Sequence, residues 1–198
     1  MIPSGYKEDV VYSQIPTDGA GDLSFTRASN GTRINSAGLV EVCPWNLLQY
    51  SEDFTNSYWN KGAASITGNA TVAPNGTTTA DKFNETATTD THQVYNTFTG
   101  NTGVATLFIY AKKAERSGLQ ITSDQATDPS AIFNLDTGVV YSSTNCTAFI
   151  EIVGDGWYKC GIIYTIDQAT SYPVFRTTNS SFATVYAGTA GYGIYIWG

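Results

Sequence analysis

The amino-acid sequence predicts an all-β protein, an antiparallel β-sandwich preceded by a short extended N-terminal segment. Only 14% of the 198 residues are charged, and Thr, Ser, Asn and Gly supply most of the polarity. Helical bundles are instead rich in Ala, Leu, Glu and Lys. Apolar residues make up 41% of the chain and aromatic residues 13%, enough for a core and unlike a disordered chain. Short alternating runs separated by Gly-containing turns favour a sandwich or barrel.

The first 45 residues differ from the rest of the chain. Residues 1–21 contain prolines and glycines and predict only short extended pieces, for example at Val10–Tyr12. A small β-meander is predicted over residues 22–42, with Asn30-Gly31 as a hairpin turn, from three short patterns: Leu23–Arg27, Thr32–Asn35 and Gly38–Val42. Two or three short strands are marginally stable alone. We therefore expect this segment to dock on its own domain, another copy or a larger assembly.

The remainder of the chain is predicted to be β-rich after one interruption. Within residues 44–61, Ser51 followed by two acidic residues predicts a helical turn over Ser51–Phe54. Alternating patterns then predict strands at Ser65–Thr71, Ala80–Asn84, His92–Thr99, Val104–Lys112, Leu119–Ser123, Ala131–Asn134, Val139–Ser142, Ala148–Val153, Trp157–Ile166, Val174–Thr178 and Tyr192–Trp197.

Two of these strands indicate how the sandwich packs. Val104–Lys112 is largely apolar on both faces, which predicts a central strand. In Trp157–Thr165, one set of alternate residues forms the predicted core face: Tyr158, Cys160, Ile162 and Tyr164.

The charge of the chain limits its partners. Ten Lys and Arg against 17 Asp and Glu give a net charge of −7 and a pI near 4.5. Because phosphate binding needs clustered Lys and Arg, no nucleic-acid partner is expected, and an anionic membrane surface is equally disfavoured. No apolar run approaches the roughly 18 residues of a membrane helix. The N-terminus lacks the pattern of a signal peptide, so we expect synthesis and folding in the cytosol.

No catalytic or zinc site is predicted. The chain has a single histidine, His92, and no Gly-x-Ser-x-Gly motif, which disfavours a Ser-His-Asp triad. No pair of carboxylates indicates glycoside hydrolysis. We interpret Cys43, Cys146 and Cys160 as small buried hydrophobic residues. The alternative is that Cys146 and Cys160 face each other across a hairpin.

Aromatic residues are the candidates for saccharide binding. A ring offers a flat apolar face to a pyranose, while neighbouring Asn, Gln or Asp residues bond its hydroxyls. The main candidates are Trp59, Tyr95 and Tyr141, with Tyr58 and Tyr172 as further ones. The alternative is that these rings pack in the core or between subunits, where Tyr and Trp are also favoured.

Seven sequence blocks follow one another in a set order: Met1–Lys7, Asp22–Ser29, Trp45–Phe54, Ala73–Lys82, Tyr110–Lys112, Asp155–Lys159 and Ile194–Gly198. The blocks and their order resemble the head-fibre, head-spike and tail-fibre proteins of tailed bacteriophages. The resemblance implies a jelly-roll domain like a carbohydrate-binding module over residues 46–198. It also implies an N-terminal virion-attachment and oligomerisation segment over residues 1–45.

The resemblance further implies a non-catalytic structural protein located in the virion, a head fibre or capsid decoration protein. It implies a homotrimer bound to capsid or tail proteins; the alternative is a tail-fibre or receptor-binding module that recognises host-surface glycans. Candidate attachment and oligomer residues are Tyr6, Tyr12, Phe25, Arg27 and Arg33. Either arginine could pair bidentately with a carboxylate of a neighbouring subunit or of its own chain.

A structural calcium ion is the candidate cofactor for such a domain, because jelly-roll domains often hold a hard cation with carboxylates and backbone carbonyls. The candidate ligands are Glu52 and Asp53, near the start of the domain, and Asp155. The alternative is that all three are solvated turn residues, since acids in turns usually cap backbone amides.

Overall fold

The computed structural model describes residues 4–7, 10–13, 32–34, 38–42, 46–99 and 102–198. The chain divides into two compact units, Met1–Asn46 and Leu47–Gly198. This division falls one residue from the domain boundary that the sequence predicts.

The N-terminal unit contains two small antiparallel hairpins. β1 (Ser4–Lys7) pairs with β2 (Val10–Ser13), and β3 (Thr32–Ile34) pairs with β4 (Val40–Val42). β2 covers the extended piece predicted around residues 10–12, whereas β1 was not predicted. β3 and β4 are two strands of the predicted meander, and its first strand, Leu23–Arg27, lies outside the described residues.

The second unit is an antiparallel β-sandwich. One sheet contains β5 (Asn60–Gly62), β9 (Gln93–Tyr95), β10 (Phe98–Thr99), β12 (Gly118–Asp124), β13 (Ser130–Asn134), β14 (Val139–Thr144) and β17 (Thr170–Thr178). The order in this seven-stranded sheet is β14-β13-β12-β17-β9-β5, and β10 also pairs with β17. Every strand pair between described residues in this unit is antiparallel.

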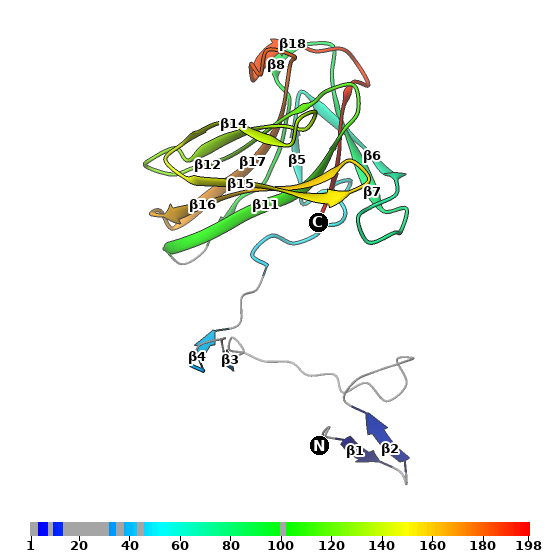
Figure 1. The fold of residues 1–198 in the computed structure, drawn as a ribbon, viewed down its shortest axis with the longest axis vertical. Helices are drawn as coiled ribbons and strands as arrows, with labels where there is room; N and C mark the ends of the chain where they lie inside the picture. Colours follow the sequence, from blue (N-terminus) through cyan, green and yellow to red (C-terminus); the bar gives the residue numbers. More distant parts are fainter. Residues whose placement is uncertain (1–3, 8–9, 14–31, 35–37, 43–45, 100–101) are drawn as a thin grey trace. The chain divides into compact units, whose positions relative to one another are not determined.

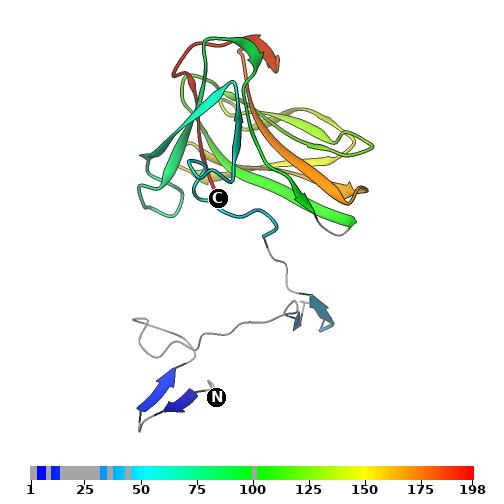
Figure 2. The same cartoon turned by 180° about the vertical axis from the view of Figure 1, so that it is seen from behind.

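The other layer is a six-stranded sheet. Its strands are β6 (Ala64–Thr71), β7 (Ala80–Glu85), β11 (Gly103–Lys113), β15 (Thr147–Gly154), β16 (Trp157–Ile166) and β19 (Gly193–Trp197), in the order β15-β16-β11-β19-β7-β6. Figures 1 and 2 show the two layers from opposite sides. A two-stranded ribbon, β8 (Thr89–Thr91) with β18 (Val185–Ala187), lies at one end of the sandwich (Figure 1).

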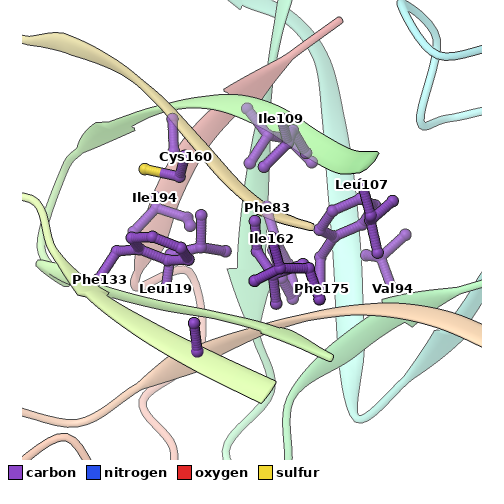
Figure 3. Close-up of a cluster of buried hydrophobic side chains, with 14 of the residues drawn as sticks. Phe83, Val94, Leu107, Ile109, Leu119, Phe133, Cys160, Ile162, Phe175 and Ile194 are labelled. Atoms are coloured by element: carbon purple, nitrogen blue, oxygen red, sulfur yellow. The ribbon is translucent and has the colours of Figure 1, made fainter. Parts of the chain in front are cut away.

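The core lies between the two sheets, as the alternating patterns predict. The seven-stranded sheet contributes side chains such as Leu119, Phe133 and Phe175, and the six-stranded sheet contributes Ile109 and Ile162 among others (Figure 3). All five are at most 2% exposed. The burial of each such side chain is worth about 1.5–3 kcal/mol, so the sequence alternation is the main determinant of which face turns inward.

The two strands singled out in the sequence have the predicted environments. β11 lies between β16 and β19, which confirms that it is a central strand. In β16, Cys160 and Ile162 are fully buried and Tyr164 is 5% exposed, which confirms the core face of that strand.

The predicted helical turn over Ser51–Phe54 is wrong. Residues 51–58 form hydrogen-bonded turns, with the amide of Asp53 donating to the carbonyl of Tyr50 at 3.1 Å. A helix here would spread the apolar side chains around its axis, whereas the turns direct both Phe54 and Trp59 into the core. Among the described residues, no helix is long and apolar enough to cross a membrane.

The cysteines within the sandwich are not disulfide-bonded. Cys160 is fully buried and Cys146 is half-buried, and both thiols are free. Cys160 stands opposite Ile150 in the β15–β16 pair, so the hairpin does not place Cys146 across from it. Cys43 lies outside the described residues.

Candidate ligand-binding face

The outward side of the seven-stranded sheet carries a row of polar side chains. In β17, Phe175 points into the core and Arg176 points outward; in β12, Leu119 is buried and Gln120 points outward. The strand register sets Arg176 opposite both Gln120 and Gln93. We define the polar face by the outward residues of the central strands: Gln93, Tyr95, Gln120, Thr122, Ser130, Tyr172 and Arg176.

A chain of side-chain hydrogen bonds orders the polar face. Arg176 donates from Nε to Gln93 Oε1 at 2.9 Å and from Nη1 to Gln120 Oε1 at 3.1 Å. Gln120 donates from Nε2 to Ser130 Oγ at 2.8 Å. Gln93 lies over Gly62 of β5, where an added Cβ would stand 3.0 Å from Gln93 Cγ. Four strands thus share one hydrogen-bonded row, which holds the guanidinium in a fixed orientation.

Arg176 carries a positive charge that no described carboxylate neutralises. Its side-chain partners are two neutral amides, and it forms no ion pair with any Asp or Glu among the described residues. Burial lowers the pKa of Arg176, yet a guanidinium remains protonated at neutral pH. Two of its five N–H groups make the bonds to glutamine. The remaining three have no partner among the residues that the structure describes and are open to a ligand.

Two tyrosines of the polar face lie along the strands from this row, both towards Thr170 of β17, and a third aromatic ring belongs to the edge strand β14. Tyr95 is half-buried next to Val174, and Tyr172 is 39% exposed further along β17. Tyr141 of β14 stacks on Phe182, with the ring centroids 4.1 Å apart. The sheet therefore combines planar hydrogen-bonding groups with aromatic surfaces, as saccharide sites do.

The three main candidates for saccharide binding lie in different environments in the structure. The prediction that Trp59 binds a saccharide is wrong, because this side chain is only 2% exposed, packs on Phe54 and donates from Nε1 to the carbonyl of Tyr50 at 2.9 Å. Its indole is therefore occupied within the core. Tyr95 lies on the polar face, and Tyr141 is 55% exposed but has one ring face covered by Phe182. Neither placement tests sugar binding, which stays a prediction for both.

The structure does not gather the calcium candidates into a cluster. Asp53 accepts hydrogen bonds from the amide and hydroxyl of Thr55, which lower the pKa of its carboxyl. Glu52 is exposed, and Asp155 occupies the β15–β16 turn with a φ of 51°. Among the described residues, no three His, Cys, Asp or Glu side chains lie together as metal ligands.

Asp81 is the acid that anchors the region near Asp53. It is 3% exposed and accepts from the amide of Phe54 at 2.8 Å and from that of Asn69 at 2.9 Å. Burial raises the pKa of Asp81 despite these two hydrogen bonds. The carboxylate thus joins the turn that follows the domain start to an irregularity in β6, a role that no local sequence pattern indicates.

A buried ion pair, which no local sequence pattern indicates either, joins three parts of the sandwich. Glu85 at the end of β7 is 1% exposed and receives two hydrogen bonds from Arg116, from Nε at 2.9 Å and from Nη2 at 2.5 Å. The hydroxyl of Tyr186 and the amide of Thr189 donate to the same carboxylate, each at 2.6 Å. Each carboxylate oxygen of Glu85 accepts two hydrogen bonds, so this group of residues, the Glu85 cluster (Glu85, Arg116, Tyr186 and Thr189), stabilises the fold and leaves no oxygen of Glu85 free for a ligand.

His92 is a buried residue that lies beside the Glu85 cluster. Its Nδ1 donates to the carbonyl of Ala63 at 2.7 Å, and its ring packs 4.7 Å from that of Tyr186. Among the described residues, Nε2 has no hydrogen-bond partner, and therefore no nucleophile is aligned with it.

The attachment candidates fall in the N-terminal unit. Tyr6, Tyr12 and Arg33 belong to β1, β2 and β3, and for these three residues the structure describes only the backbone. Phe25 and Arg27 lie outside the described residues. Their role in attachment stays a prediction.

No sequence signal could have found the polar face. Gln93, Gln120 and Arg176 are far apart in the chain and belong to no motif. Only the register of β9, β17 and β12 brings them together. Comparison of the chain with models of known protein families gives no match, and comparison with curated proteins gives none either.

Proposed function

We propose that this chain is a non-catalytic structural component of a tailed-phage virion, a head fibre or decoration protein anchored through residues 1–45. The seven sequence blocks support this proposal. The structural observation that carries it is a separate N-terminal unit with exposed apolar residues. Ile34 and Val40 pair across β3 and β4 and are 71% and 73% exposed. Such a pair suits a segment that another subunit or the particle covers.

A homo-oligomer is part of the proposal, and the outward side of the six-stranded sheet supports it. Val104, Phe108 and Ile163 are 79%, 39% and 39% exposed on this side. Lys159 Nζ lies 4.5 Å from the ring centroid of Phe108 and 5.8 Å from that of Phe149. Contact with other copies would remove this apolar surface from water.

Light scattering after size-exclusion chromatography tests the oligomer on the full chain. The expected mass is that of a trimer of the 21.3 kDa chain. Ile163→Asp places a charge on the exposed apolar surface and is expected to shift the mass towards the monomer. Thr144→Asp, an exposed substitution on the other sheet, is the matched control and should leave the trimer intact. A monomeric wild-type chain would contradict the proposal.

Deletion of residues 1–21 tests attachment. The shortened chain is expected to keep the circular-dichroism spectrum of the sandwich but to be lost from purified particles, because the deletion removes β1 and β2. Quantitative mass spectrometry of the particles measures this loss. Incorporation of the shortened chain at the wild-type level would show that residues 1–21 are not the anchor.

A second candidate function, recognition of host-surface glycans, is favoured by the polar face. The free donors of Arg176 and the aromatic rings of Tyr95 and Tyr172 lie on one surface of the sandwich. A glycan array probed with the full chain is expected to give reproducible binding to a subset of saccharides. A blank array, obtained with protein whose fold is verified, would count decisively against this function.

A further inference from the structure

The charge of Arg176 restricts what the polar face can bind. Arg176 and Asp124 are the charged side chains at the described outward positions of this sheet, and no ion pair joins them. Asp124 stands opposite Tyr172, four residues along β17 from Arg176, which is roughly 13 Å at 3.3 Å per residue. The guanidinium is thus half-buried, held by two amides and without an anion.

This arrangement differs from the other arginine of the sandwich. Arg116 is also half-buried, but its charge is matched by the Glu85 carboxylate in a bidentate pair. Taking a cation partly out of water costs free energy unless an anion or hydrogen bonds compensate it. At Arg176 the hydrogen bonds to Gln93 and Gln120 compensate in part. One N–H group of Nη1 and both of Nη2 have no partner among the described residues, and they form the free edge of the guanidinium.

From this contrast we infer that the polar face binds an acidic saccharide, with the carboxylate of the sugar paired to the free edge of Arg176. This inference rests on glycan recognition by the same face. Two parallel N–H···O bonds from a guanidinium to a carboxylate are short and geometrically specific. Because Arg176 is already held by two side chains, little conformational entropy is lost when the carboxylate binds.

The groups around Arg176 match the rest of a sugar. Gln93 Nε2 has no hydrogen-bond partner among the described residues and can donate to ring or hydroxyl oxygens. On the neighbouring strands, Thr122 Oγ1 already donates to the carbonyl of Pro129 at 2.9 Å and keeps acceptor lone pairs, whereas Ser130 Oγ accepts from Gln120 and keeps its own proton to donate. Tyr95, two residues along β9 from Gln93, supplies apolar ring surface, which an acidic peptide segment would not need.

The net charge of the chain favours ligands with a single carboxylate. At −7, the protein repels a polyanion over the Debye length of about 8–10 Å, whereas one carboxylate at Arg176 experiences mainly the local cation. Terminal nonulosonic acids and terminal hexuronic acids both meet this description. The shared chemistry is one carboxylate beside a pyranose ring.

NMR titration of the full chain with matched sugar pairs tests the inference. The pairs are sialyllactose against lactose, and a glucuronic-acid-terminated disaccharide against its glucose analogue. At least one acidic member is expected to bind about tenfold or more tightly than its neutral partner, since a tenfold change corresponds to the 1.4 kcal/mol of a modest ion pair. The two pairs distinguish the two sources of the carboxylate.

Substitution of Arg176 locates the effect. Arg176→Gln should reduce the acidic preference about tenfold, and Arg176→Lys, which keeps the charge but not the planar fork, should restore only part of it. Lys112→Gln, an equal loss of charge on β11 of the opposite sheet, should change nothing. If Arg176→Gln is unstable, Arg176→Lys alone still reports the loss of bidentate pairing.

The remaining outcomes separate the two levels of the proposal. Equal binding of acidic and neutral partners, unaffected by Arg176→Gln, would overturn the acidic preference and leave glycan recognition standing. No binding of any glycan by folded protein would overturn both. Binding of a glutamate-rich peptide as tightly as the acidic sugars would show that the face recognises carboxylates of a protein partner, which also overturns the inference.

Discussion

Replacing Glu85 by alanine is expected to lower the free energy of unfolding by about 3–5 kcal/mol, the range for removing one partner of a buried ion pair. The carboxylate is 1% exposed and is the common acceptor for Arg116, Tyr186 and Thr189. Without it, the guanidinium loses its carboxylate acceptor inside the protein, and the phenol keeps only its hydrogen bond with the Thr177 hydroxyl. Urea unfolding followed by tryptophan fluorescence measures the change.

Glu115→Ala is the matched control for this substitution. Glu115 also accepts from a cation, Lys82 at 2.9 Å, but its side chain is 40% exposed. Exposed pairs are worth about 0–1 kcal/mol. A similar loss in the free energy of unfolding in both variants would mean that the buried ion pair of Glu85 does not stabilise the fold more than an exposed one.

The same carboxylate predicts how stability depends on pH. Burial alone raises the pKa of Glu85, but the hydrogen bonds from Arg116, Tyr186 and Thr189 outweigh it and hold the pKa below its ordinary value. A lowered folded-state pKa stabilises the protein above the unfolded value of about 4.3, and this contribution is lost as the pH falls through the folded-state pKa. The urea concentration at the unfolding midpoint should therefore decrease as the pH is lowered below about 4.3. The decrease should be smaller in Glu85→Gln, which has no carboxyl group to titrate at this position.

Gly193→Ala is expected to destabilise the sandwich by about 3 kcal/mol, at the upper end for overpacking a rigid site. Gly193 begins β19, and an added Cβ would stand 1.8 Å from the backbone oxygen of Phe83 on β7. The obstacle is backbone in a paired strand, so β7 and β19 must separate. Thermal and urea unfolding both report the loss.

Gly62→Ala is the control, because it makes the same chemical change on the edge strand β5. There the new Cβ meets only the flexible side chain of Gln93, at 3.0 Å. The expected loss is below about 1 kcal/mol, since Gly→Ala also restricts the unfolded chain. Equal destabilisation by the two substitutions would show that the close strand approach at Gly193 is not what matters.

Much of the sandwich could be predicted because, in a half-buried strand, alternating apolar and polar residues show directly which side chains face the core. The patterns at Val104–Lys112 and Trp157–Ile166 identify β11 and β16 and, for β16, the buried face. Short strands were missed for a physical reason. β5, β8 and β18 have three residues each, too few for a pattern, and their pairing comes from neighbours distant in sequence.

The candidate site was less predictable than the fold. Residue type alone selected Trp59, yet burial of its large apolar surface outweighs any exposed role. Tyr95, selected from the sequence, lies on the polar face, and its role in sugar binding stays a prediction. Arg176 was not selected, because an isolated arginine in a strand pattern has no distinguishing signal until the register places two glutamines beside it. Side chains that become neighbours only through strand pairing cannot be identified from the residues next to them in the sequence.

Chemical-shift mapping on the full chain is the most direct test of whether the polar face is a binding surface. With the acidic saccharide that binds most tightly, the amide and side-chain signals of Gln93, Gln120 and Arg176 should move together on β9, β12 and β17. Signals of the six-stranded sheet should stay in place. Shifts confined to β11, β15 and β16, or no shifts at saturating saccharide, would contradict the assignment of this face.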